Sequence, residues 1–275
     1  MNSTVIKIEN LKIENVRLSP PKVNKRGGKN IYINYVYNTN EQPKKLRIQL
    51  PFMKAPFGVS GFSVGPDGKS SSIPNEESSD AIELAFSGKD DIGIGKIEKL
   101  EALLVNHAFD NSKEYFNKKK SLDACKMFFT SGVKYDLDED GMQSDMYPPR
   151  IRCKMGRSLD NVYSVQIYDP NKQKVAMDLS NHNEVITKMS ECCTIIDCAG
   201  WVVGEKFGIS FRPAQMKVKK NETALNDYAF IEDESDENND DDDTADKMNS
   251  MTFEEPNEEY MLDPLEPSTT PRRRS

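Results

Sequence analysis

The sequence predicts a mainly β body of the barrel or sandwich type, with one or two helices, followed by a disordered acidic tail. Roughly eight to ten short segments alternate apolar and polar residues, which is the pattern of half-buried strands. One segment, residues 95–117, instead spaces its apolar residues by three and four, as an amphipathic helix does. From Ile231 onward the chain is acidic and poor in apolar residues, so it cannot bury a core of its own.

The N-terminal segments are expected to be strands. Residues 4–18 alternate apolar and charged side chains, which predicts one or two half-buried strands with a bulge or bend at Asn10 or Asn15. Residues 31–37 and 46–50 alternate in the same way. Because turn-forming Asn and Pro residues lie between these two segments, the pair predicts a β-hairpin.

The middle of the chain combines long loops with the main helix. Residues 51–80 are rich in Gly, Pro and Ser, which predicts a long loop with a short strand inside it, and residues 81–86 predict a further strand. The helix over 95–117 follows. Lysines 118–120 lie at its C-terminal end, where positive charge is favourable. Residues 136–149 are a second polar loop.

Strands are expected again in the last third of the body, interrupted by a short helix over residues 183–191. No repeat of 20–50 residues recurs, which argues against a solenoid or a propeller. The expected strands cover residues 150–155, 161–168, 174–179, 194–203, 207–211 and 215–219.

The net charge of −8 conceals two parts of opposite sign. Residues 232–266 hold 16 Asp and Glu against one Lys, whereas residues 1–230 hold 33 Lys and Arg against 29 Asp and Glu. We therefore expect a folded body over 1–230 and a disordered tail over 231–275 that ends in Arg272-Arg273-Arg274. An acidic tail can compete with nucleic acid for a basic body, although runs of like charge are also typical of solvated chain ends.

The cysteines and the hydropathy indicate the compartment. The five cysteines form an odd set without a CxxC pair, which indicates reduced, intracellular thiols. No stretch approaches the roughly 18 apolar residues that span a bilayer, and the first residues lack the apolar region of a secretory signal. The sequence therefore predicts a soluble intracellular protein without a membrane partner.

No motif in the sequence indicates an enzyme, a cofactor or a metal. Gly68-Lys69-Ser70 matches the end of a phosphate-binding loop, but the first glycine of that motif is missing. Residues 136–141 match the first half of a calcium-binding loop, but Tyr147 replaces its bidentate glutamate. His107 and His182 have no evident partners for metal binding or proton transfer. We expect a non-catalytic protein whose 136–140 segment is a solvated acidic loop, with a weak cation site as the alternative.

Two expected strands, 45–50 and 150–155, carry several cations on one face. Both alternate so that their cations point away from their apolar residues. The cations on these faces are Lys45, Arg47, Arg150, Arg152 and Lys154.

Aromatic residues and a basic loop lie close to these strands in the sequence. Tyr32 points away from the apolar face of its strand, and Phe57 lies in the Gly-rich loop beside Phe52. The loop over 20–29 contributes Lys25, Arg26 and Lys29. Single-stranded nucleic acid requires cations for its phosphates and aromatic faces for its bases. The combination predicts a nucleic-acid-binding surface, although charged outer faces and tyrosines are also ordinary features of strands.

Residues 194–218 resemble the C-terminal part of the single-stranded-DNA-binding proteins of large nucleocytoplasmic DNA viruses, the African swine fever virus and giant-virus type. In both, a strand leads through a short turn into Gly208-Ile209-Ser210-Phe211 and then into a last strand that ends in Lys217-Val218. The basic strand Arg150-Ile151-Arg152 is similar to one in that family. The resemblance extends loosely over 30–219 and implies an OB-like β-barrel that coats single-stranded DNA.

The resemblance also implies a biological setting. It implies a role in viral DNA replication, recombination and repair, at replication sites in the host cytoplasm or nucleus, with packaging in the virion as a further expectation. The acidic tail would moderate DNA binding and recruit replication proteins. The alternative is a viral scaffold or interaction protein whose acidic tail docks on basic proteins such as histones or capsid proteins.

Overall fold

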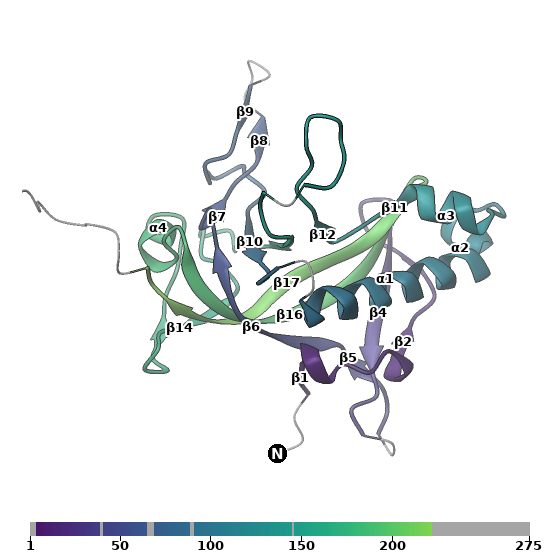
Figure 1. The fold of residues 1–275 in the computed structure, drawn as a ribbon, viewed down its shortest axis with the longest axis horizontal. Coiled ribbons are helices and arrows are strands. Elements are labelled where there is room, and N and C mark those ends of the chain that lie inside the picture. Colours follow the sequence, from purple (N-terminus) through teal and green to yellow (C-terminus); the bar gives the residue numbers. More distant parts are fainter. Residues whose placement is uncertain (1–3, 39–40, 65–68, 89–90, 145, 222–275) are drawn as a thin grey trace, which may run out of the picture. The chain divides into compact units, whose positions relative to one another are not determined.

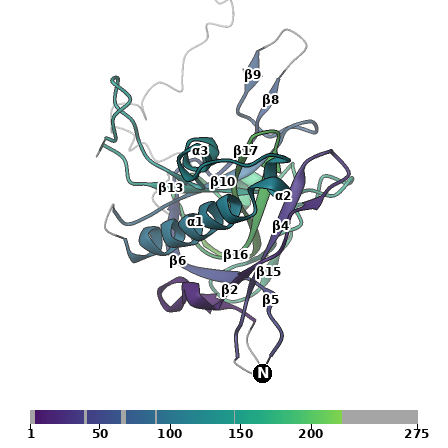
Figure 2. The same cartoon turned by 90° about the vertical axis from the view of Figure 1, so that its right-hand side faces the viewer.

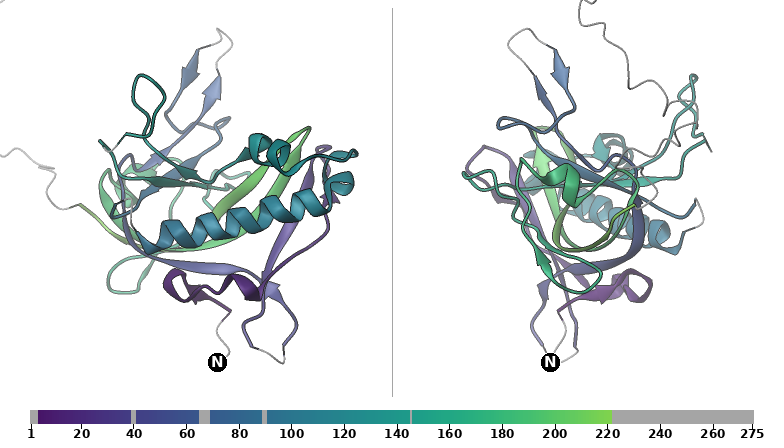
Figure 3. Two further views of the ribbon diagram at one scale, coloured as in Figure 1. Left: turned by 45° about the vertical axis from the view of Figure 1, so that its right-hand side comes forward. Right: turned by 90° about the vertical axis from the view of Figure 1, so that its left-hand side faces the viewer.

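A ring of five strands forms the centre of the fold. The structure, a computed structural model, describes residues 4–38, 41–64, 69–88, 91–144 and 146–221. Each strand of the ring is hydrogen-bonded to the next, and β16 also pairs with β6, which closes the ring (Figures 1 and 3). In order around the ring, these strands are β6 (Arg47–Ala55), β10 (Ala81–Ala85), β13 (Arg150–Lys154), β17 (Lys206–Lys219) and β16 (Ser190–Val203).

The order of the strands identifies the connectivity. The fourth strand in the chain, β16, lies between the first, β6, and the fifth, β17. The β13–β17 pair is parallel, and the other pairs in the ring are antiparallel. This is the Greek-key order of an OB fold, so the predicted mainly β, OB-like body is confirmed. The predicted tail, residues 231–275, lies outside the described residues.

The two strands that we expected to form a hairpin instead follow one another along one edge of the long strand β16. Its first half pairs with β6 and its second half with β4 (Lys29–Tyr35), while β17 pairs along its other edge. The predicted hairpin is limited to β5 (Lys44–Lys45), which pairs with Asn34 and Tyr35. The Leu46 N–H still donates to the Ile33 carbonyl oxygen at 2.9 Å, and from Arg47 onward the chain pairs with β16 as strand β6.

The remaining strands are short and extend the ring at its edges. The hairpin of β8 and β9 projects from it at the top of Figure 1. The predicted strands 207–211 and 215–219 are one strand, β17, whose pairing shifts at a bulge opposite Ile195 and Ile196. The short strands are β1 (Ile6–Lys7), β2 (Val16–Leu18), β3 (Lys22–Val23), β7 (Val59–Ser60), β8 (Ser63–Val64), β9 (Ser70–Ser71), β11 (Phe129–Thr130), β12 (Val133–Lys134), β14 (Gln166–Tyr168) and β15 (Lys174–Val175).

The predicted N-terminal strands are largely replaced by turns. Between β1 and β2 the chain forms two 3₁₀ turns, η1 (Ile8–Asn10) and η2 (Ile13–Asn15). These turns end at the two asparagines where we expected a bend. Ile8 and Leu11 are both buried, and a straight strand would place residues three apart on opposite faces. Burial of both side chains therefore favours the turns.

The three helices between residues 92 and 128 lie together on one side of the ring, apart from the short helix over residues 182–185 (Figures 1 and 2). The predicted helix is divided at Asn111 into α1 (Ile92–Asp110) and α2 (Ser112–Phe116), and α4 (His182–Val185) is shorter than expected. The sequence analysis missed α3 (Leu122–Phe128), which packs on α1. Among the helices that the structure describes, none is long and apolar enough to cross a membrane.

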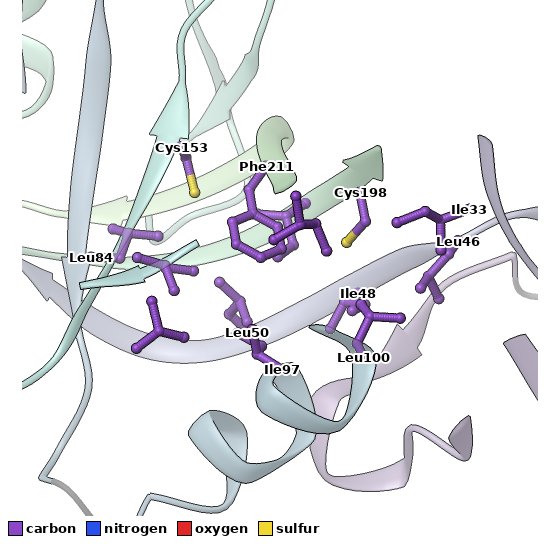
Figure 4. Close-up of a cluster of buried hydrophobic side chains, with 14 of the residues drawn as sticks. Ile33, Leu46, Ile48, Leu50, Leu84, Ile97, Leu100, Cys153, Cys198 and Phe211 are labelled. Carbon is purple, nitrogen blue, oxygen red and sulfur yellow. The ribbon is translucent and has the colours of Figure 1, made fainter. Parts of the chain in front are cut away.

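The core fills the ring and the space between the ring and α1. Figure 4 shows Ile48, Leu84 and Phe211 from the strands pointing toward Ile97 and Leu100 of α1. All five side chains are fully buried. Because one face of every ring strand is committed to this core, the alternate side chains of the same strands must point outward.

Candidate nucleic-acid interface

The predicted outer faces are present in the structure. Lys45, Arg47 and Gln49 are at least partly exposed, while the apolar residues between them are buried. In β13, Arg150, Arg152 and Lys154 likewise alternate with buried residues. Tyr32 is 50% exposed between the buried Ile31 and Ile33. The structure also shows which of these outward faces lie next to one another.

Part of these faces forms a hollow of about 270 Å³ on the outer surface of β4, β16, β17 and β13. We call this hollow the groove. The cross-strand register explains how it is assembled, because Ala199 of β16 lies between Tyr32 of β4 and Ser210 of β17. The side chains that line the groove and could contact a ligand are Tyr32, Lys45, Lys154, Asp197, Trp201 and Arg212.

The aromatic side of the groove is formed by Trp201 and Tyr32. Trp201 is half-buried and lies opposite Gly208 in the β16–β17 register. A Cβ atom on Gly208 would come within 3.1 Å of Trp201 Cζ2, so the missing side chain leaves room for the indole. The Lys22 Nζ lies 5.5 Å from the centroid of the Tyr32 ring, which places a cation against this aromatic face.

The floor of the groove contains one carboxylate held between cations. The Lys45 Nζ donates to Asp197 Oδ2 at 2.5 Å, and the Arg47 Nε donates to Asp197 Oδ1 at 3.1 Å. Arg212 lies opposite Asp197 in the β16–β17 register. The Asp197 side chain is 18% exposed, so this carboxylate neutralises part of the charge where an anionic ligand would bind.

Lys154 and Arg212 supply positive charge without such a partner. Within the described part of the chain, neither forms an ion pair with a carboxylate. Both also line an adjoining hollow of about 590 Å³, where Arg26 is a further wall residue. That second hollow contains Glu76 and Glu77 as well, so the groove is the more cationic of the two.

Three predicted residues lie away from the groove. Arg150 pairs with Glu83 at 3.2 Å, and Glu83 also accepts from Lys134 at 2.7 Å. Phe57 packs near Arg150, with its ring centroid 5.6 Å from the guanidinium carbon. Arg152 lies opposite Glu83 in the β10–β13 register. Glu83 therefore balances part of the positive charge on this part of the surface.

The three cations of the predicted basic loop over residues 20–29 lie in different environments. The Lys29 Nζ donates to the carbonyl oxygens of Glu114 and Tyr115 and to Asn117 Oδ1, at 2.6–3.1 Å, and so closes the C-terminal end of α2. Lys25 is exposed, and Arg26 lines the hollow beside the groove. A DNA-contacting role for these three residues stays a prediction.

Asp197, Trp201 and Arg212 were not among the predicted site residues. The alternation signal was present, because residues 196–202 place Asp197 and Trp201 on the face opposite the buried Ile196 and Cys198. Arg212 also alternates with buried neighbours, since the bulge of β17 comes only after Pro213. Its position beside Lys154 depends on the parallel β13–β17 contact, which the local sequence does not encode.

Acid–base or metal chemistry has little support in the described residues. No group of three or more His, Cys, Asp or Glu side chains that could hold a metal ion occurs in that part of the chain. In the 136–140 loop, the Asp138 carboxylate accepts hydrogen bonds from the backbone N–H groups of Asp140 and Met142. Burial raises the pKa of the Cys153 and Cys198 thiols, which disfavours the reactive thiolate.

Three solved structures of the single-stranded DNA-binding protein from bacteriophage Enc34 are similar to this chain. The complex with single-stranded DNA is 13% identical, covers 76% of this chain and 95% of its own, and has a TM-score of 0.37. The C-terminally truncated form is 12% identical over 78% and 98%, with a TM-score of 0.36. A third structure is 14% identical over 74% and 90%, with a TM-score of 0.35. No family model and no curated protein match the sequence.

Proposed function

We propose that the protein binds single-stranded DNA, without catalysis and with little sequence preference, in the groove. The observation that carries this proposal is the placement of Trp201 and Tyr32 beside Lys45, Lys154 and Arg212 in one hollow. Aromatic faces stack with any base, and cations pair with any phosphate, so the combination binds a single strand irrespective of its sequence. A duplex hides its bases inside the helix and would engage only the cations.

The sequence resemblance gives this proposal a biological setting. The residues that carry the resemblance, 194–218, form most of β16 and β17, which supply Asp197, Trp201 and Arg212 to the groove. We therefore propose a role in viral DNA replication, recombination or repair, at replication sites in the cytoplasm or nucleus of the host or in the virion. Membership of the giant-virus family is part of the same proposal.

The acidic residues 232–266 support a second element of the proposal. Sixteen carboxylates on one segment resemble the charge of a nucleic acid and can compete with it for cations. The same segment could recruit replication proteins that carry basic surfaces. The alternative function, a scaffold that docks on basic proteins through this tail, rests on the same composition and does not require the groove.

The first prediction uses Trp201, which is the only tryptophan in the chain. Titration with oligo(dT) at low salt should quench its fluorescence, because a base that stacks on the indole changes its environment. Trp201→Ala should raise the Kd about tenfold, within the range of roughly 1–3 kcal/mol for one stacked base. Trp201→Phe, which keeps a stacking face, is the matched control when Kd is measured by anisotropy of a labelled oligonucleotide. Unchanged fluorescence and no binding at low salt would remove the proposal.

A second prediction concerns Asp197. Asp197→Asn should lower the Kd for oligo(dT) about threefold, since a charge at roughly 7 Å in water contributes about 0.6 kcal/mol of repulsion. It should also make the slope of log K against log salt more negative, by about 0.7 for each phosphate that Lys45 or Arg47 newly contacts. Glu205→Gln, which removes an exposed carboxylate from the β16–β17 turn, is the control. A weaker complex would instead mean that Asp197 holds the two cations in their binding positions.

A third prediction concerns the tail. Deletion of residues 231–275 should lower the Kd for oligo(dT) at low salt, and the difference from the full chain should shrink as added salt screens the competition. Replacement of the same segment by an uncharged sequence of equal length separates charge from length. If deletion leaves Kd unchanged at every salt concentration, the tail does not moderate binding, and recruitment of a partner would be its remaining role.

A further inference from the structure

The outer face that contains the groove continues along β16 toward its N-terminal end. Outward residues of β16 recur every second position, and each lies between an outward residue of β6 and one of β17. Beyond Asp197, the next row is Gln49–Ile195–Gln215. The two rows after it are Phe52–Cys193–Lys217 and Lys54–Glu191–Lys219. We call the six residues of these last two rows the distal strip.

The distal strip repeats the charge arrangement of the groove. Glu191 lies between Lys54 and Lys219, just as Asp197 lies between Arg47 and Arg212. The Lys219 Nζ is 3.8 Å from Glu191 Oε2, and both side chains are about half exposed, so water screens this pair. Lys217 has no ion-pair partner among the described residues. The strip therefore offers more positive than negative charge to an anion.

An aromatic ring lies within this cationic surface. The Phe52 side chain is 43% exposed although it belongs to a strand of the ring. The Lys219 Nζ covers it at 4.2 Å from the ring centroid, as a cation–π contact. A flat base can occupy the same ring face, and the displaced ammonium then becomes free to pair with a phosphate. Phe52 and Lys219 together thus provide the two kinds of contact found in the groove.

Space for a ligand is present next to Lys219, the residue that covers the phenyl ring of Phe52. A hollow of about 640 Å³ is lined by Lys54, Met189, Glu191 and Lys219, with Pro170 and Lys220 at its edge. Met189 is 43% exposed, so part of its apolar side chain is accessible to a ligand in this hollow. The hollow is open, mixed in polarity and bordered by lysines, which suits a nucleotide better than an apolar ligand.

We propose that the distal strip is a second contact surface for the same DNA strand, which runs along β16 from Trp201 to Phe52. This inference rests on the proposed function of the groove. Phe52 pairs with Cys193, which is eight residues from Trp201 along β16 and thus roughly 26 Å away. A short oligonucleotide therefore reaches only the groove, while a longer one contacts both surfaces. Phe52 is the distal stacking platform, and Lys217 and Lys219 bind phosphates.

The test compares two lengths of oligo(dT), about 3 and about 20 nucleotides, on the full chain. Phe52→Ala should raise the Kd of the long oligonucleotide about tenfold and leave that of the short one unchanged. Phe52→Tyr keeps a stacking face and should bind the long oligonucleotide as the unmodified chain does. A double variant, Lys217→Glu with Lys219→Glu, tests the phosphate contacts at outward positions and should reduce the salt slope of the long oligonucleotide by about 0.7 per lost contact.

A charge-matched control is available on the helices. Lys113→Glu with Lys126→Glu changes the net charge equally at two exposed lysines of α2 and α3. Equal loss of affinity in this control and in the strip variant would overturn the inference, because the effect would then be one of net charge. A loss by the strip variants that is the same for both oligonucleotide lengths would overturn it too. Failure of the unmodified chain to bind either oligonucleotide would instead remove the proposed function itself, together with this extension of it.

Discussion

The pairing of β16 along both of its edges is the constraint on which the rest of the structure depends. This 14-residue strand pairs with β17 over its whole length and with β6 and then β4 along the other edge. It therefore closes the ring and attaches β4 to it. A shift of register by one residue would exchange the buried and outward faces of the strand. The buried side chains of β16, Ile196 and Cys198 among them, therefore fix the outward position of Asp197 and Trp201.

Two glycines show how closely the neighbouring elements approach these strands. A Cβ atom on Gly200 would come within 3.0 Å of the Ile31 Cβ and within 3.4 Å of Leu104 of α1. A Cβ on Gly208 would collide with the backbone oxygen of Thr130 in β11. The first glycine lets α1 pack on the sheet, and the second lets β11 pair with β17 while the indole of Trp201 lies beside it. The core and the groove thus constrain the same strands from opposite faces.

Alternation in the sequence was sufficient to predict which face of each strand is exposed. It placed Lys45, Arg47 and Tyr32 outward because a period of two needs only local information. It could not show that β4 and β6 pair with successive parts of β16, or that β13 lies against β17, because both depend on pairing between residues far apart in the chain. For the same reason Lys154 could not be connected with Arg212.

Hydrogen bonds and ion pairs between distant segments account for the rest of the difference. The sequence places Lys29 among the cations of a basic loop. In the structure its ammonium group donates hydrogen bonds to carbonyl oxygens at the C-terminal end of α2. Arg150 looked equivalent to Lys154, but Glu83 from β10 lies beside it. Trp201 carried the required alternation signal, and its importance becomes apparent only when Tyr32 from β4 is seen across the same hollow. Composition predicts that cations and aromatics are present, and topology decides which of them meet.

Photo-cross-linking tests the central claim, that a single strand lies in the groove, most directly. An oligo(dT) in which single thymines are replaced by 5-iodouracil would be irradiated in complex with the full chain, and the attached peptides would be identified by mass spectrometry. We expect cross-links to Trp201 and Tyr32, and we expect them to be lost when a duplex replaces the single strand. Cross-links confined to α1–α3, or to Phe57 and its neighbours, would contradict it.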